Sequence, residues 1–259
     1  MRAWIAVAAL MSAKVGMAQD AGSAVARPTV ENRAAAFPDL GADPHSMMLE
    51  RPMNYFVLLD QLEVLDTDPD RSVAWDLDAW FGKDLSRLVV RSEGKRVDGD
   101  TERADLQLLW SHSFSRWWSW VAGARLDFAP GSDREWAAFG IEGLAPQRFE
   151  IEATAYVGDS GDTALRFEAE HEERVTNRLK LQPRIEVEWH GQDDPLRGIG
   201  AGLSSIEVGL RLRFEIRREI APYIGVGWQR KYGRTADLAR AGGADGEDTS
   251  LVAGIRLWL

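Results

Sequence analysis

The stretch LKLQPRIEVEWH, residues 179–190, alternates between apolar and polar side chains along its whole length. The apolar positions are Leu179, Leu181, Pro183, Ile185, Val187 and Trp189, and the polar positions are Lys180, Gln182, Arg184, Glu186, Glu188 and His190. Successive side chains on a β-strand point to opposite faces, so this stretch predicts a strand with one apolar and one charged wall.

The same alternation recurs from about residue 55 to residue 259, for example in residues 149–157 and 206–216. The predicted strands lie at about 56–65, 73–81, 85–92, 104–111, 117–128, 136–144, 149–157, 163–171, 179–190, 205–216, 221–231 and 249–259. Many of them have the length of about 9–11 residues that a tilted strand needs to cross a bilayer. Strands of soluble sheets are shorter, centred near about 5–6 residues.

The polar face of nearly every predicted strand carries both acidic and basic side chains. An apolar outside and a polar lumen give this pattern in a membrane barrel, whereas a soluble barrel would invert it. An even number of strands also closes the sheet without a free edge. The sequence therefore predicts an all-β fold, a closed antiparallel transmembrane β-barrel of about 12 strands and of the outer-membrane type.

The 11 tryptophans fit this prediction. Trp110, Trp118 and Trp120 share the outward parity near one predicted end of the barrel, and Trp189 and Trp228 share it near the other. Amphipathic aromatic rings favour the interface between membrane and water, so these residues predict two girdles. A tryptophan-rich core of a soluble β-sandwich is the alternative.

Composition excludes several classes of function. The chain has 31 Lys and Arg residues against 41 Asp and Glu residues, and its net charge is −10. A nucleic-acid-binding protein needs a basic surface, so we expect no nucleic-acid partner. The absence of cysteine excludes disulfides, thiolate metal sites and cysteine nucleophiles.

The sequence divides into three parts. Residues 1–18 resemble a secretory signal peptide, with a charged start, an apolar run and small residues at a cleavage position. Residues 19–54 are rich in Ala, Pro, Asp and Gly and predict a flexible periplasmic segment. Residues 55–259 form the predicted barrel, with both of its ends in the periplasm and mostly longer outer loops, which include 93–103, 191–204 and 232–248.

Two motifs raise the question of catalysis. Gly158–Gly161 reads Gly-Asp-Ser-Gly, as in the nucleophile segment of trypsin-like proteases, but no histidine lies in a matching context and a tight turn explains it better. His112 with Ser113 or Ser115 could form the pair of an outer-membrane phospholipase, yet these residues fall in a predicted periplasmic turn. We expect no enzymatic activity and no catalytic residues.

The predicted lumen carries many charges, and two interpretations remain open. One is a network of ion pairs that fills a narrow barrel, and the other is a path for cations. In the second case the candidate ligands are Glu150, Glu152, Glu168 and Glu186.

A second candidate metal site lies before the first strand. His45, Met47, Met48 and Met53 stand close together in the flexible segment, and Asp43 precedes them. Thioether and imidazole groups suit copper, and thioethers suit Cu(I) especially, while a carboxylate could add an oxygen ligand for Cu(II). A chance cluster of these residue types is the alternative.

Long stretches of the barrel region resemble the copper resistance protein B family of bacterial outer membranes. They include AWDLDAWFGKDLSRLVVRSEG (74–94), ADLQLLWSHSFSRWW (104–118), WAAFGIEGLAPQRFEIEATAYVGDSGDTALRFEAE (136–170), LKLQPRIEVEWHGQDDPLRGIGAGLSSIEVGLRLRFEIRREIAPYIGVGW (179–228) and TADLAR (235–240). The resemblance covers about residues 55–259. Many family members also carry a long segment of repeated Met, His and Asp residues, and this chain differs there.

The resemblance implies a role in copper resistance and a location in the outer membrane of a Gram-negative bacterium. The expected function is to bind, sequester or export copper ions at the cell surface. Expected partners are outer-membrane lipid, copper ions and a periplasmic copper-binding protein. A general small-solute porin and an outer-membrane barrel hydrolase are the alternatives.

Overall fold

The computed structural model describes residues 29–31, 53–66, 71–129, 131 and 133–259. The predicted signal peptide and most of the segment 19–54 lie outside the described residues, and so do Asp43, His45, Met47 and Met48. The barrel region is described almost completely and belongs to one compact unit, residues 51–259.

Nearly all of the described barrel region is β-strand. The strands are β1 (Asn54–Asp66), β2 (Arg71–Lys83), β3 (Ser86–Val97), β4 (Asp100–Ser113), β5 (Trp118–Ala129), β6 (Arg134–Ala145), β7 (Phe149–Gly158), β8 (Thr163–His171), β9 (Glu173–Arg174), β10 (Leu179–His190), β11 (Gly202–Phe214), β12 (Ile220–Lys231) and β13 (Glu247–Trp258). A 3-10 turn, η1 (Pro146–Arg148), joins β6 to β7, and a helix, α3 (Gly233–Ala241), joins β12 to β13.

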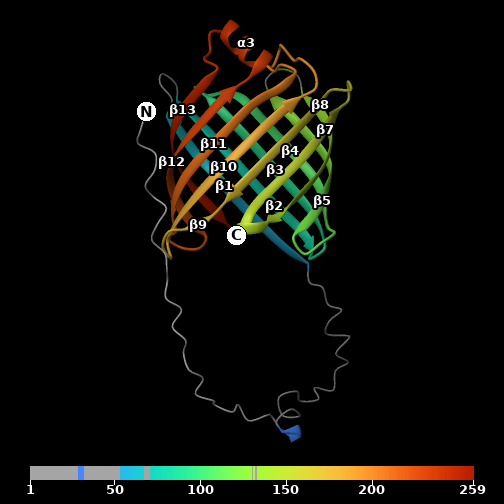
Figure 1. The fold of residues 1–259 in the computed structure, drawn as a ribbon, viewed down its shortest axis with the longest axis vertical. Coiled ribbons are helices and arrows are strands. Elements are labelled where there is room, and N and C mark those ends of the chain that lie inside the picture. Colours follow the sequence, from blue (N-terminus) through green and yellow to red (C-terminus); the bar gives the residue numbers. More distant parts are fainter. Residues whose placement is uncertain (1–28, 32–52, 67–70, 130, 132) are drawn as a thin grey trace, which may run out of the picture. The chain divides into compact units, whose positions relative to one another are not determined.

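The strands form one closed antiparallel barrel (Figure 1). Each long strand pairs with its neighbour in sequence, and β1 closes the sheet by pairing with β13, from Leu58 opposite Trp258 to Asp66 opposite Leu251. The two-residue β9 only extends the edge of β10. Within the described residues the barrel therefore has twelve long strands, one at each predicted position, and the predicted fold is confirmed.

The two faces of the barrel differ as the alternation predicts. On β10 and β11 the outward Ile185, Trp189 and Leu210 are exposed, while the inward Glu186 and Arg211 are 7% and 5% exposed. Exposed apolar side chains cover the outside of the isolated barrel, and charged side chains fill the lumen. This is the arrangement of a transmembrane barrel, in which lipid covers the apolar face.

The lumen also holds an apolar cluster that the sequence analysis did not predict. It is formed by Val89, Leu109, Val121, Trp136, Ala138 and Tyr156, on β3 to β7. Trp136 is 6% exposed and donates a hydrogen bond from Nε1 to Asp127 Oδ2 at 2.8 Å. One side of the lumen is therefore packed like a protein core.

The two ends of the barrel are unequal. The end that carries α3, the loop end, has the long connections 191–201 and 232–246, whereas the end that holds the C-terminus, the turn end, has short turns (Figure 1). The described residues contain no helix that is long and apolar enough to span a membrane.

Two connections differ from the sequence prediction. Residues 93–103 were expected to be a long loop, but β3 and β4 continue toward a tight turn at Asp98 and Gly99, which both have positive φ. The segment 232–248 contains α3, which was not predicted. The Gly158–Gly161 motif forms the predicted turn, with Gly161 at φ 84°.

The predicted outward direction of the tryptophans is confirmed in its main part. Trp110, Trp120 and Trp189 are exposed on the outer face, at 51%, 41% and 43%. Trp118 and Trp228 are half-buried. Trp118 packs where Gly143 on the neighbouring strand leaves room, because a Cβ at Gly143 would lie 2.7 Å from its ring.

Candidate metal path in the barrel lumen

Five glutamates occupy directly opposed positions on five adjacent strands, and we call them the carboxylate row. They are Glu142 on β6, Glu152 on β7, Glu168 on β8, Glu186 on β10 and Glu207 on β11. The register of the barrel brings them together although they are far apart in sequence. Like charges in directly opposed positions repel each other, so the row requires cations to stabilise it.

Arginines supply these cations. Arg91 lies 2.6 Å from Glu142 and 2.7 Å from Glu152. Arg184 lies 2.7 Å from Glu168, and Arg166 lies 2.9 Å from Glu186. Because a guanidinium group offers several donors in a fixed plane, each arginine bridges more than one carboxylate.

The same arginines reach across the lumen. Arg184 on β10 lies 3.1 Å from Asp76 on β2, and Arg166 on β8 lies 2.7 Å from Glu93 on β3. In each pair the two strands are five places apart around the barrel, close to opposite sides. The lumen is therefore crossed by ion pairs.

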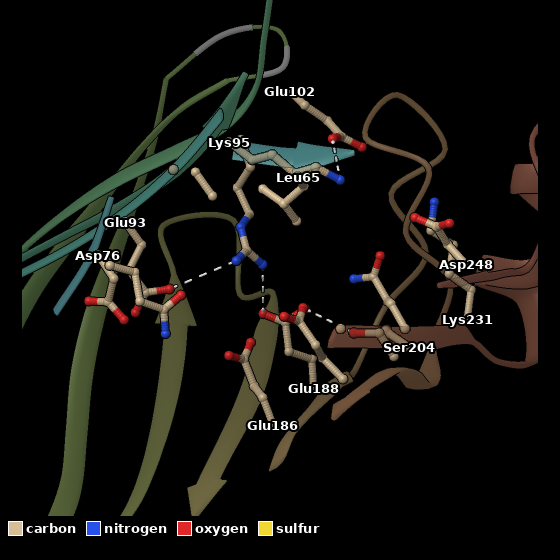
Figure 2. A pocket seen from close by; sticks show the side chains of 18 of the residues that line it. Leu65, Asp76, Glu93, Lys95, Glu102, Glu186, Glu188, Ser204, Lys231 and Asp248 are labelled. Carbon is tan, nitrogen blue, oxygen red and sulfur yellow. Dashed lines mark hydrogen bonds and ion pairs between the residues drawn. The ribbon is translucent and has the colours of Figure 1, made fainter. Parts of the chain in front are cut away.

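A cavity of about 300 Å³ lies on the loop-end side of these ion pairs. Its lining includes Glu93, Glu186, Glu188, Glu207 and Asp248. In Figure 2 the labelled acidic side chains Glu93, Glu186 and Glu188 point into the same space. Arg103 lies between two of them, 3.8 Å from Glu93 and 3.6 Å from Glu188.

A second cavity, of about 540 Å³, opens at the turn end. The charged residues of its lining are mainly basic and include Lys180, Arg213 and Arg256. Glu172 lies between β8 and β9 and forms ion pairs with all three of these cations. Burial alone would raise the pKa of Glu172, but its hydrogen bond with Lys180 and the nearby arginines hold the pKa below its usual value.

Side chains between the two cavities close the lumen further. Arg211 donates hydrogen bonds to both carboxylate oxygens of Glu63, at 3.0 and 2.8 Å, and to Gln61 at 3.0 Å. Arg213 donates to Gln182 Oε1 at 2.8 Å. Hydrogen bonds and ion pairs of this kind therefore cross the described lumen between the two cavities.

The predicted lumen ligands come together in part. Glu152, Glu168 and Glu186 are neighbours in the carboxylate row, whereas Glu150 is opposite Glu170, outside the row. The oxygens of Glu152, Glu168 and Glu186 are directed to arginines. Among the described residues no group of three or more His, Asp or Glu side chains is arranged to hold a metal. The residues fit weak, separate contacts with a cation, not a closed coordination cage.

The predicted tail site lies almost entirely outside the described residues. Of its five members only Met53 is described, directly before β1, and its side chain is 53% exposed. The position of Met53 puts the end of this segment at the turn end of the barrel.

Sequence reasoning missed several lumen charges, namely Glu63, Asp76, Asp78, Arg91, Glu93 and Arg103. A signal was present for some of them. Asp76 and Asp78 alternate with Trp75, Leu77 and Ala79 in a predicted strand. Glu93 and Arg103 fell in the segment taken as an outer loop.

The residues considered for a hydrolase are engaged elsewhere. Ser113 Oγ shares a hydrogen bond with Ser119 Oγ at 3.0 Å. Ser115 Oγ accepts hydrogen bonds from the backbone N–H groups of Trp117 and Trp118. His112 stacks on Trp110 with ring centroids 5.3 Å apart. This geometry does not favour a Ser–His nucleophile.

Comparison with solved structures supports the fold. A NanC porin structure covers 79% of this chain and 99% of its own chain with a TM-score of 0.53, at 12% sequence identity. At this identity the likeness concerns the fold alone. Together with the apolar outer face, it identifies an outer-membrane barrel.

Comparison with sequences gives the family. A copper resistance protein B homolog of Pseudomonas syringae pv. tomato is 50% identical over 206 residues, which are 80% of this chain and 70% of the relative. Copper resistance protein B of Escherichia coli is 47% identical over 230 residues, which are 89% of this chain and 77% of the relative. The family model described as copper resistance protein B precursor matches residues 53–259. This chain is therefore a member of the copper resistance protein B family of outer-membrane barrels.

Proposed function

We propose that this protein acts in copper resistance by binding copper ions in its lumen and passing them along the carboxylate row. The observation that carries the proposal is the row itself, five glutamates on adjacent strands beside a cavity of about 300 Å³. Membership in the copper resistance protein B family identifies copper as the metal. The role is one of binding and transfer, without catalysis.

The glutamates of the carboxylate row suit the transfer of copper ions better than their storage. Carboxylate oxygens bind Cu(II) less strongly than imidazole or thiolate ligands do. A path that conducts ions needs several sites that bind well enough to be entered and weakly enough to be left. Arginines that bridge two carboxylates can release one of them as a cation arrives, so that charge balance is kept at each step.

The segment before the barrel can supply a second, softer site. Asp43, His45, Met47, Met48 and Met53 offer one carboxylate, one imidazole and three thioethers. Such a site would prefer Cu(I), and it would exchange copper with a periplasmic copper-binding protein. The proximity of Met53 to β1 at the turn end supports this role.

The experiment compares variants in a strain that lacks the gene. The lumen variant Glu152→Gln/Glu168→Gln/Glu186→Gln removes three charges from the row. The control Asp133→Asn/Asp237→Asn/Asp245→Asn removes three exposed charges at the loop end. We expect lower copper tolerance and weaker copper binding by the purified barrel only for the lumen variant, at equal amounts of folded protein.

Two further outcomes are informative. If only the replacement of His45, Met47, Met48 and Met53 lowers tolerance, the tail and not the lumen is the copper site. If folded lumen and tail variants both keep full copper binding and tolerance, the proposed function is wrong.

A further inference from the structure

The two ends of the barrel carry opposite charge. The exposed acidic residues at the described loop end are Asp66, Asp98, Asp100, Glu102, Asp133, Glu135, Asp159, Asp193, Asp237, Asp245 and Glu247. The exposed basic residues at the turn end are Lys83, Arg116, Arg148, Arg174, Arg178, Arg217 and Arg218, against the exposed acidic residues Asp84, Glu150, Glu173 and Glu219. The turn end is therefore basic and the loop end acidic.

The basic residues of the two ends also differ in their partners. At the loop end, Arg134 lies 2.9 Å from Asp194, and Arg240 lies 2.8 Å from Asp237. At the turn end, Arg116, Arg148 and Arg217 form no ion pair with any described residue. These three guanidinium groups are exposed and free to bind an anion from outside the chain.

Within the described residues, four of the five turns at this end place an exposed apolar side chain beside an exposed cation. The pairs are Lys83 with Leu85, Arg116 with Trp117, Arg148 with Phe149, and Arg217 with Ile216. Trp117 and Ile216 are 57% and 58% exposed. We call these four pairs the basic rim; in the fifth turn Arg174 lines the turn-end cavity instead.

We propose that the basic rim binds the phosphate head groups of anionic phospholipids in the leaflet at the turn end. The apolar member of each pair sits at the level of the acyl chains, and the cation sits at the level of the head groups. A guanidinium group binds a phosphate through two parallel hydrogen bonds. The rim thereby fixes which leaflet the turn end occupies, because the acidic loop end repels the same lipids.

The occupant is lipid rather than a soluble anion because charge and apolar surface lie side by side at four of the five turns. A free phosphate ion would use the arginines but leave the apolar side chains in water. A lipid satisfies both, and its attraction to each basic residue near the surface corresponds to about 1 kcal/mol, or about fivefold in affinity.

The test measures lipid selectivity of the full barrel in phosphatidylcholine vesicles that contain a small amount of spin-labelled lipid. The rim variant is Arg116→Gln/Arg148→Gln/Arg217→Gln. The matched control is Arg230→Gln/Arg234→Gln/Arg240→Gln at the loop end. We expect labelled phosphatidylglycerol to be preferred over labelled phosphatidylcholine by the parent protein and the control, and the preference to fall about fivefold at the altered sites of the rim variant.

The proposal is overturned if the rim variant keeps the preference of the parent protein, or if the loop-end control loses as much. It is also overturned if added inorganic phosphate displaces labelled phosphatidylglycerol, since the rim would then be a site for free anions. Retention of the unheated, fast-migrating form on SDS gels shows that each variant is folded. The copper experiments are independent of every one of these outcomes.

Discussion

Arg211 is the clearest case in which a single side chain holds distant strands together. It is 5% exposed, and its partner Glu63 is 3% exposed and also accepts a hydrogen bond from Tyr223. A buried charge that loses its partner keeps the full cost of burial, which is about 3–5 kcal/mol.

We therefore expect Arg211→Met to lower the free energy of unfolding by about 3–5 kcal/mol. The double variant Arg211→Met/Glu63→Gln should recover much of this loss, because no unpaired charge remains. Urea titration of the folded fraction in detergent measures both. A double variant as unstable as the single one would contradict this account.

Ile185 tests the outer face. It lies near the middle of β10, and its side chain is exposed on the face that lipid covers. Arginine at such a position costs about 2–4 kcal/mol, so Ile185→Arg should reduce the yield of folded barrel, while Ile185→Leu should not. Heat-modifiable migration on SDS gels measures this yield, and equal yields would mean that the faces are assigned wrongly.

For a single residue, the sequence predicts which face of the barrel the side chain occupies but not which residues it contacts. Alternation alone assigns Arg184 and Glu186 to the lumen, because a strand has a period of two. It does not reveal that Arg184 meets Asp76, which is 108 residues away in the chain. That contact depends on the curvature of the closed barrel, which no local pattern contains.

Among the elements, α3 shows where local patterns fail. Its nine residues have no side-chain N-cap, and an isolated helix of this length is marginal in water. It is held instead by tertiary contacts, since Thr235 and Ala236 are buried. Thr235 Oγ1 accepts a hydrogen bond from the backbone N–H of Gly200 at 2.9 Å and thereby ties α3 to the connection 191–201.

The strand prediction failed at β3 and β4 for a different reason. Residues 93–103 are rich in charge and glycine, as expected for a loop. The strands continue there because backbone hydrogen bonds between strands form whether or not one face of the hairpin is apolar. Lys95, for example, lies opposite Arg103. Predicted strands therefore ended too early where the hairpin continues beyond the apolar alternation.

We expect Thr235→Val to loosen α3 without unfolding the barrel. The buried N–H of Gly200 loses its acceptor, at a cost of about 1–3 kcal/mol. Hydrogen exchange at Gly200 and in α3 should become faster, while exchange in β10 and β11 stays slow. Thr235→Ser keeps the hydroxyl and should exchange like the parent protein, and faster exchange in both variants would assign the effect to lost packing instead.

For the whole molecule, the main question is whether the lumen is open. Arg166 and Arg184 connect nearly opposite strands through Glu93 and Asp76, and the bridges lie beside the carboxylate row. A filled lumen of this kind argues against free passage of large solutes. The porin alternative requires such passage.

We expect the parent protein to give little conductance in a planar bilayer and the variant Arg166→Gln/Arg184→Gln to give more. Without the two guanidinium groups the cross-lumen bridges are lost. Asp76, Glu168 and Glu186 lose their cations and Glu93 keeps only Arg103, so the added current should be carried by cations. Arg240→Gln, on the exposed surface of α3, is the matched control and should conduct like the parent protein. Fast migration of unheated samples on SDS gels shows that each protein is folded. If the parent protein already passes uncharged sugars as fast as the variant does, the ion pairs do not close the lumen, and the barrel works as a general porin.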